Sequence, residues 1–177
     1  TLPFQNRATA ASPPGSTFKL VTALSAALAG EDKFDRKLLC DGGQGYGNSW
    51  MRCWISAQGG SHGWLNVSQA IKSSCNDFFY QQGNLAGIKN IVTVGRLLGL
   101  GDPTGVPLDG EGGGILPTPE WLRMYGNRQW GAADTAQVSI GQGAMSATPL
   151  QMCNVVATIA NRGLCFKPRL VSRLVDA

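Results

Sequence analysis

The segment Pro13-Pro14-Gly15-Ser16-Thr17-Phe18-Lys19 places a serine and a lysine three residues apart at the start of an apolar run. Residues three apart share one face of a helix, so we expect the Ser16 hydroxyl and the Lys19 amine to lie within hydrogen-bond reach. A serine hydroxyl becomes a nucleophile when a base removes its proton, and a desolvated lysine can be that base. The apolar run predicts a buried helix over residues 16–29, ended by Gly30, and burial favours a neutral lysine. Alone, the pair is more typical of a capping serine and an ordinary surface lysine than of a catalytic pair.

A second polar cluster, Ser73-Ser74-Cys75-Asn76, interrupts a predicted helix in the middle of the chain. Serine and asparagine favour helix breaks and caps, so the cluster has a purely structural interpretation of its own. A Ser-x-Asn spacing is nevertheless present, and it is formed by Ser74 and Asn76. Ser73 offers an alternative hydroxyl that does not fit this spacing.

Two further segments follow in order, Ser139-Ile140-Gly141-Gln142-Gly143 and Thr148-Pro149-Leu150-Gln151. Together with Ser-x-x-Lys and Ser-x-Asn, they resemble the transpeptidase domain of class B penicillin-binding proteins, most closely the elongation-specific penicillin-binding protein 2 family. The resemblance extends from Asn6-Arg7-Ala8 to Lys167-Pro168-Arg169 and covers nearly the whole chain. It implies the mainly helical part of the penicillin-binding protein/beta-lactamase-like fold, with long irregular loops and little sheet, as one partial domain over residues 1–177.

The resemblance also implies roles for individual residues. Ser16 would attack the D-alanyl-D-alanine end of a peptidoglycan stem peptide, and the acyl group would then pass to an amine on a neighbouring strand. Lys19 would be the base, although the acylation base is disputed among related enzymes. Ser74 would relay a proton to the leaving group, and Asn76 would hold the substrate amide. A beta-lactam would trap Ser16 as an acyl adduct, while residues 139–143 would form a buried turn that supports the site.

One element of the family does not occur in this chain. Serine acyltransferases of this kind carry a Lys-Ser/Thr-Gly motif on a strand that lines the site, and no lysine here precedes Ser-Gly or Thr-Gly. The chain begins with Thr1 rather than Met and is interpreted as a fragment of a longer protein. We therefore expect the parent protein to be an enzyme and this chain alone to be inactive.

Three cysteines and the single histidine supply the ligands of a tetrahedral zinc ion: Cys40, Cys53, His62 and Cys75. Residues 31–63 show no sustained periodicity, and so long an irregular stretch usually needs a staple to stay ordered. The resemblance adds that penicillin-binding protein 2 members bind zinc near this place with aspartate replacing some thiolates, so Asp41 is an alternative ligand. We predict a structural zinc ion that orders the loop over about residues 40–75 without joining acyl transfer.

The sequence also allows the cysteines to form disulfides or to remain free. A Cys40–Cys53 disulfide competes with zinc, because disulfides form readily outside the cytoplasm, and an odd total of 5 cysteines does not suit a closed disulfide set. Cys153 falls in an apolar helical pattern and is predicted to be a buried small hydrophobe. Cys165 begins a predicted strand and could pair with Cys153.

The remaining elements follow from caps and periodicity. Helices are predicted from Asn66 or Ser68, over residues 89–98 and 119–125, and over about 148–162, where Thr148 and Gln151 form a capping box. Residues 101–118 are rich in Gly and Pro and predict an extended surface loop. Leu164 to Val175 alternates in the manner of a strand.

Composition excludes some functions. The chain has 177 residues, a net charge of +4 and no basic run interleaved with aromatic residues, which argues against nucleic-acid binding. The longest apolar stretch, Phe18 to Ala29, is too short to span a bilayer. By resemblance, the parent would be anchored in the inner membrane, would work on its periplasmic face and would contact membrane proteins of the elongation machinery.

Two other functions share part of this pattern. A serine beta-lactamase or beta-lactam sensor also carries Ser-x-x-Lys and Ser-x-Asn, but the Gly-Gln-Gly turn, the Thr-Pro-Leu-Gln helix start and the Cys/His loop favour the transpeptidase. A non-enzymatic, zinc-stabilised cell-wall scaffold is the third hypothesis. The intact set of Ser16, Lys19, Ser74 and Asn76 argues against it.

Overall fold

The computed structural model describes residues 6–31 and 35–173, and its regular structure is mostly helical. The helices are α1 (Lys19–Leu28), α2 (Val67–Lys72), α3 (Asn76–Ala86), α4 (Ile88–Leu97), α5 (Pro119–Gly126), α6 (Ala132–Ser139) and α7 (Pro149–Ala160). A short 3₁₀ helix, η1 (Gly15–Phe18), leads into α1. The predicted fold class, mainly helical with little sheet, is confirmed. None of the helices in the described ranges is long and apolar enough to cross a membrane.

The strands in the described residues are short and form two antiparallel pairs. β1 (Leu38–Cys40) pairs with β4 (Gly63–Leu65), and β2 (Gly43–Tyr46) pairs with β3 (Ser49–Arg52). A 3₁₀ helix, η2 (Trp54–Gln58), follows β3. The sequence did not indicate these strands, because each has only three or four residues with mixed exposure and none extends far enough to show a two-residue period. We call residues 38–65 the strand module.

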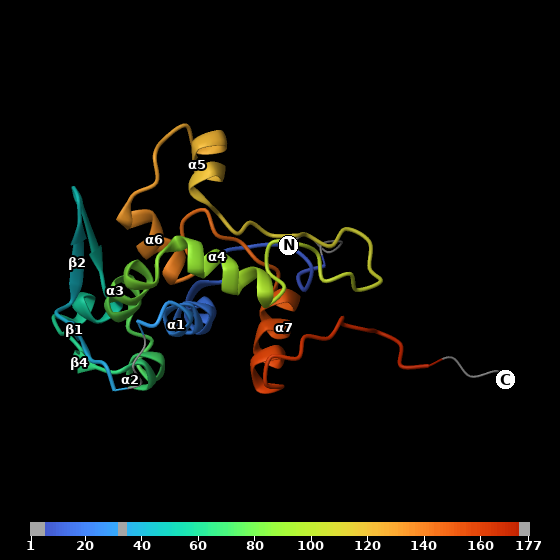
Figure 1. Ribbon diagram of the computed structural model, residues 1–177, viewed down its shortest axis with the longest axis horizontal. Coiled ribbons are helices and arrows are strands. Elements are labelled where there is room, and N and C mark those ends of the chain that lie inside the picture. The colour runs from blue at the N-terminus through green and yellow to red at the C-terminus, as the bar shows by residue number, and fades with distance from the viewer. Residues whose placement is uncertain (1–5, 32–34, 174–177) are drawn as a thin grey trace.

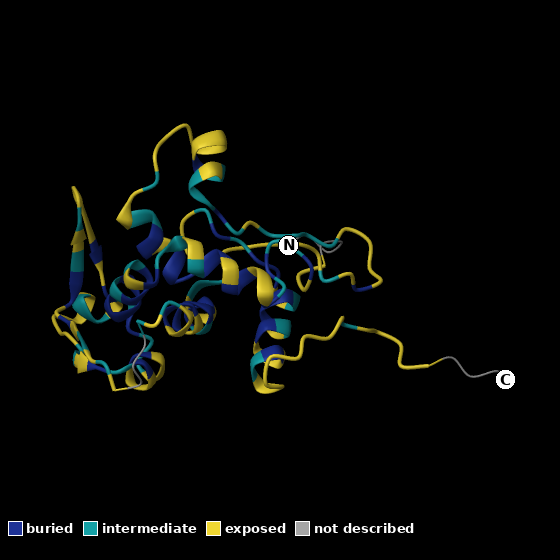
Figure 2. Ribbon diagram, viewed as in Figure 1, coloured by how far each residue is buried: buried dark blue, intermediate teal, exposed yellow. Residues whose placement is uncertain are grey.

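The helices pack around α1 and α3. Figure 1 shows α3 beside the strands at one end of the molecule and α7 at the other side of α1. One buried cluster joins α1, α4, α6 and α7 and includes Phe18, Val21, Ile91, Val138 and Val155. A second cluster surrounds Phe78 and Phe79 of α3 and also takes in the cysteines of the strand module. The buried residues in Figure 2 accordingly concentrate on these central helices.

Local signals predicted most helix ends correctly. Asn66 caps α2 in a capping box with Gln69, and Thr148 caps α7 in a capping box with Gln151. Gly30 adopts a φ of +73° just after α1, as expected for a residue that ends a helix. The first predicted turn of α1 is 3₁₀ rather than α-helical, a common feature of helix starts.

Two expectations about the second half of the chain were wrong, and one helix was missed. Residues 164–173 form no strand: Leu164 and Phe166 are largely exposed, and no neighbouring strand in the described residues pairs with them. The last part of that prediction, residues 174–175, lies outside the described residues. Cys153 is exposed rather than buried, because it lies on the outward face of α7, and both Cys153 and Cys165 are free. Helix α6 was not predicted; it begins after Gly131 with only eight residues.

Candidate active site and metal centre

The turn that carries Ser16 is held by a close approach of two backbone segments. Gly15 has a φ of +59°, and its N–H donates to the carbonyl of Gly141 over 3.0 Å. Gly141 has a φ of +67°, and a Cβ there would lie 2.4 Å from the Gly15 carbonyl oxygen. Only glycine fits such a position. Residues 139–143 therefore form the predicted tight turn behind the Ser-x-x-Lys segment, with Ser139 fully buried.

Ser74 lies between α2 and α3, and its backbone has a conformation that residues other than glycine rarely adopt. Its φ is +50°, in the left-handed region that costs energy for a residue with a Cβ. The reversal joins the last turn of α2 to Cys75, which caps α3 by accepting a hydrogen bond from the Phe78 N–H at 3.4 Å. It also brings the Ser74 hydroxyl to 3.0 Å from the Ser16 hydroxyl. Ser73 points elsewhere, because its hydroxyl donates to the Gln69 carbonyl of α2 at 3.0 Å.

Lys19, the first residue of α1, lies beneath this pair of hydroxyls and is only 3% exposed. Its Nζ donates to the Ser74 carbonyl at 2.7 Å, the Ser74 Oγ at 3.0 Å and the Asn76 Oδ1 at 2.7 Å. These are three neutral acceptors for the three donors of an ammonium group, and no carboxylate in the described residues forms an ion pair with it. Burial lowers the pKa of Lys19 to about 8, so about a tenth of it is neutral at pH 7.

The structure thus brings together all four predicted catalytic residues, which come from segments more than fifty positions apart. Ser74 Oγ lies between Ser16 Oγ and Lys19 Nζ, with both contacts at 3.0 Å. A neutral Lys19 would use its two N–H donors on the Ser74 carbonyl and Asn76, which leaves its lone pair toward the Ser74 hydroxyl. The arrangement can therefore move a proton from Ser16 through Ser74 to Lys19.

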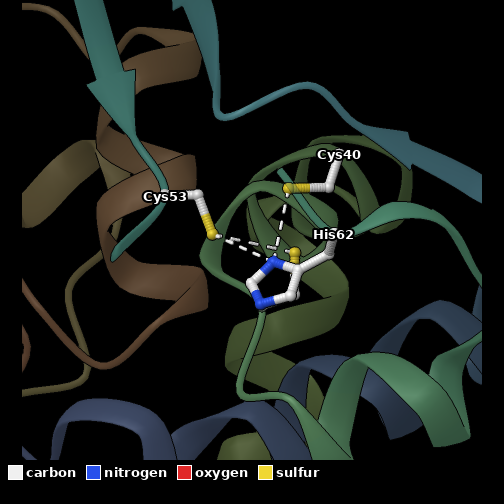
Figure 3. Close-up of side chains that lie close together, drawn as sticks. Cys40, Cys53 and His62 are labelled. Carbon is white, nitrogen blue, oxygen red and sulfur yellow. Dashed lines mark hydrogen bonds between the residues drawn. The ribbon is translucent and has the colours of Figure 1, made fainter. Parts of the chain in front are cut away.

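The four predicted metal ligands also converge, directly behind this loop. The ligand atoms of Cys40, Cys53, His62 and Cys75 all lie within 4.8 Å of one another. Figure 3 shows the sulfurs of Cys40 and Cys53 directed at the ring of His62. The three cysteines are buried and free, so the competing Cys40–Cys53 disulfide is not formed. The alternative ligand Asp41 does not belong to the cluster.

Three distances between these atoms match a tetrahedral zinc site. A tetrahedron with Zn–S of about 2.3 Å and Zn–N of about 2.0 Å has edges of about 3.8 Å between sulfurs and about 3.5 Å between sulfur and nitrogen. The Cys53 and Cys75 sulfurs are 3.8 Å apart. His62 Nδ1 lies 3.5 Å from the Cys40 sulfur and 3.6 Å from the Cys53 sulfur. A hydrogen bond from Cys75 lowers the pKa of Cys53, which favours one thiolate even without metal.

Residues of α3 hold the first ligand in place. Asp77, in the first turn of α3, is fully buried and accepts a hydrogen bond from the Asp41 N–H at 3.0 Å. Gln81, one turn later, donates to the Leu39 carbonyl at 2.7 Å and to Asp77. Their contacts bracket Cys40 on both sides. The sequence did not reveal this pair, because hydrogen bonds from a helix to a distant strand leave no local pattern.

Comparisons with known proteins agree with the fold and the motifs. The family model described as the penicillin binding protein transpeptidase domain matches residues 1–176. Peptidoglycan D,D-transpeptidase MrdA of Salmonella typhimurium is 34% identical over 177 residues, and that of Escherichia coli K12 is 35% identical over 170 residues. Each match covers 96% of this chain but 27% of the relative, so the chain spans about a quarter of the length of these curated relatives.

Solved structures give the same result. Penicillin-binding protein PBP2 from Helicobacter pylori is 32% identical with a TM-score of 0.87, and the match covers 94% of this chain and 31% of that one. Pseudomonas aeruginosa PBP2, solved in complex with WCK 5153, is 30% identical with a TM-score of 0.89, and the match covers 97% of this chain and 37% of that one. Because the family model matches nearly its whole length and the solved PBP2 structures share its fold, this chain belongs to the family of penicillin-binding protein transpeptidase domains.

Proposed function

We propose that the protein containing this chain is a peptidoglycan D,D-transpeptidase of the penicillin-binding protein 2 kind, with Ser16 as its nucleophile. The observation that carries the proposal is the hydrogen-bonded chain Ser16–Ser74–Lys19, which ends at a buried lysine whose pKa is lowered to about 8. A buried amine that is partly neutral near physiological pH is suited to act as a general base. Membership of the transpeptidase family supports the same reaction.

In this mechanism, Ser16 Oγ attacks the carbonyl carbon of the penultimate D-alanine of a stem peptide. Its proton passes to Ser74 Oγ, while the proton of Ser74 passes to Lys19 Nζ. The C–N bond breaks, and the departing D-alanine takes a proton back along the same path, which leaves an ester on Ser16. An amine from a neighbouring strand then attacks that ester, releases Ser16 and forms the cross-link. Because Asn76 Oδ1 is engaged by Lys19, its Nδ2 remains to bind the substrate amide.

Part of the site must come from outside this chain. The Lys-Ser/Thr-Gly motif does not occur in it, and the chain spans 27% of its curated relatives. Oxyanion holes combine several backbone or side-chain donors, and Ser16 supplies a single backbone N–H. We therefore propose that the whole protein is acylated rapidly, whereas this chain alone is acylated slowly or not at all.

We also propose a structural zinc ion held by Cys40, Cys53, His62 and Cys75. Bound there, zinc would supply a fixed cross-link with no open coordination position, and hence no water to activate. The fit of the sulfur and nitrogen distances to a tetrahedron supports the proposal. Cys75 is the middle residue of Ser74-Cys75-Asn76, so the ion would anchor the catalytic loop from behind.

Location and partners are part of the same proposal. From the family to which the chain belongs, we propose that the protein acts on the periplasmic face of the inner membrane. Beta-lactams, which resemble the scissile amide, would acylate Ser16. One solved relative is a complex between PBP2 and MreC from Helicobacter pylori, and for this protein we likewise propose partners among the membrane proteins of the elongation machinery.

Labelling by a fluorescent penicillin tests the function. The whole protein should form a covalent adduct, Ser16→Ala should form none, and Lys19→Ala should slow the reaction about a hundredfold or more. Ser73→Ala is the matched control, because its hydroxyl faces α2 rather than the site, and it should label normally. Rapid turnover of the adduct would favour a beta-lactamase, and a stable fold without labelling would favour a scaffold. Labelling that survives Ser16→Ala would overturn the assignment.

A further inference from the structure

The side chain of Trp54 connects the metal centre to the catalytic loop. Trp54 directly follows Cys53 and begins η2. Its indole Nε1 donates to two carbonyls of the loop, that of Ser73 at 3.1 Å and that of Ser74 at 3.2 Å. The ring also meets the imidazole of His62 edge-on, with centroids 5.2 Å apart. Trp54 is 44% exposed, so its indole N–H could be satisfied by water. It instead makes three specific contacts with the protein.

The Ser74 carbonyl links the Trp54 hydrogen bond to the catalytic residues. It also accepts the hydrogen bond from Lys19 Nζ at 2.7 Å, so two donors hold the same peptide group. Ser74 has a φ of +50°, a disfavoured conformation that persists only when its surroundings impose it. Any relaxation of this residue toward negative φ would move its carbonyl away from both donors and its hydroxyl away from Ser16.

The two donors to the Ser74 carbonyl, Lys19 and Trp54, differ in whether their protonation changes during the reaction. In the proposed mechanism Lys19 alternates between an ammonium with three donors and an amine with two. The indole N–H of Trp54 keeps its single proton throughout, because it is a donor only and does not titrate. It is therefore the constant restraint on the Ser74 peptide group while Lys19 changes state.

We propose that Trp54 is a positioning residue for acyl transfer: its N–H holds the Ser74 carbonyl and so keeps the Ser74 hydroxyl aligned with Ser16 and Lys19. This inference rests on the function proposed above. Trp54 forms no hydrogen bond to Ser16 or Lys19, and its N–H contacts the site through the backbone carbonyls of Ser73 and Ser74. The proposal predicts an effect on the chemical step rather than on penicillin affinity or folding.

Trp54→Phe in the whole protein is the first test, because it removes the N–H but retains an aromatic ring against His62. The limiting rate of acylation by a penicillin should fall roughly threefold to tenfold, the range that one neutral hydrogen bond controls. The affinity of the initial complex, the melting temperature and the metal content should not change. Trp64→Phe is the matched control, since it alters another exposed indole of the strand module, on β4, and it should acylate at the native rate.

A second variant isolates the single proton. Trp54 replaced by benzothienylalanine keeps the shape of the indole and exchanges its N–H for sulfur, so it should show the same fall in limiting rate as Trp54→Phe. A native limiting rate in this variant would overturn the proposal, as would a loss that appears only as weaker affinity or lower melting temperature. Absence of any adduct on Ser16 in the native protein would instead overturn the proposed function, so the two failures are distinguishable.

Discussion

The helical body, which consists of α1 and the helices packed around it, and the strand module bury different kinds of side chains. Around α1 the body buries large apolar side chains such as Phe18, Val21 and Ile91, none of them exposed. The strand module has short strands, leaves Trp50 and Trp64 each 64% exposed, and buries chiefly Cys40 and Cys53 together with Met51 and Leu65. A region with so little apolar surface cannot offset the entropy of ordering its chain. The body is stabilised by packing, and we propose that the strand module is stabilised by a metal ion bound to Cys40, Cys53, His62 and Cys75.

The catalytic residues lie where these two regions meet. Ser16 and Lys19 belong to the helical body, while Ser74 and Asn76 flank a cysteine whose sulfur lies in the ligand cluster. The active geometry therefore requires both regions to be intact, but a change in one should not unfold the other. The predictions that follow separate the two.

Removal of zinc should have the largest effect, and it should be confined to one region. Structural zinc sites contribute about 10 kcal/mol or more to small metal-dependent folds at neutral pH. After chelation, amide hydrogen exchange should therefore lose its protection across residues 40–65 while the amides of α1 and α4 remain protected as an internal reference. Uniform protection of both regions after chelation would show that the strand module does not depend on metal.

Phe18→Ala tests the body in the converse way. Phe18 is fully buried between α1 and its neighbours, so the cavity should lower the free energy of unfolding by about 3–5 kcal/mol. Zinc stoichiometry measured on the folded variant should stay native. Phe166→Ala, at a position that is 66% exposed, is the control and should leave denaturant unfolding unchanged.

Gly141→Ala tests the contact that positions the Ser-x-x-Lys turn. The new methyl group would meet the Gly15 carbonyl at 2.4 Å, and such overpacking costs about 1–3 kcal/mol. Acylation of Ser16 should fall as well, because the turn must move. Gly47→Ala separates the clash from the backbone conformation: Gly47 has a similar φ of +57° with nothing within 4 Å. Equal losses of acylation in both variants would refute the role of the close approach.

The pH dependence should give the smallest effect. The base is active when neutral, and desolvation lowers the pKa of Lys19 to about 8, so the acylation rate should rise about tenfold from pH 7 to pH 9 with a midpoint near 8. Stability should shift in the same direction. The charged amine is disfavoured in the folded state, so Lys19 opposes folding below pH 8, and this opposition disappears as pH rises toward 10.5. A flat rate profile would exclude Lys19 as the base.

How far the sequence predicts the structure depends on whether a feature is local. The Ser-x-x-Lys pair, the caps at Asn66 and Thr148 and the glycine after α1 are set by neighbours along the chain, and the structure places them as expected. The ligand cluster was predictable because cysteine and histidine are rare enough for their number alone to be informative. The contacts of Trp54 and Asp77 were not predictable. They are single hydrogen bonds to backbone atoms, and no residue pattern encodes them.

The wrong predictions have the same origin. Alternation over residues 164–175 suggested a strand, but a strand needs a partner, and the described residues supply none. Cys153 occurs in an apolar helical pattern, yet which face of α7 is covered depends on packing that the helix itself does not specify. The positive φ of Ser74 also lacks a local cause, because serine does not favour it. The contacts found at this residue are long-range ones, because the Ser74 carbonyl accepts hydrogen bonds from Lys19 and Trp54.

Native mass spectrometry of the whole protein, before and after benzylpenicillin and with the adduct mapped to a peptide, tests the central claim most directly. The account predicts one zinc ion per chain before the reaction and one penicilloyl group afterwards, on the peptide that contains Ser16. Chains from which zinc has been removed should form little adduct in the same time. A metal-free chain that is fully acylated, or an adduct on any residue other than Ser16, would contradict it.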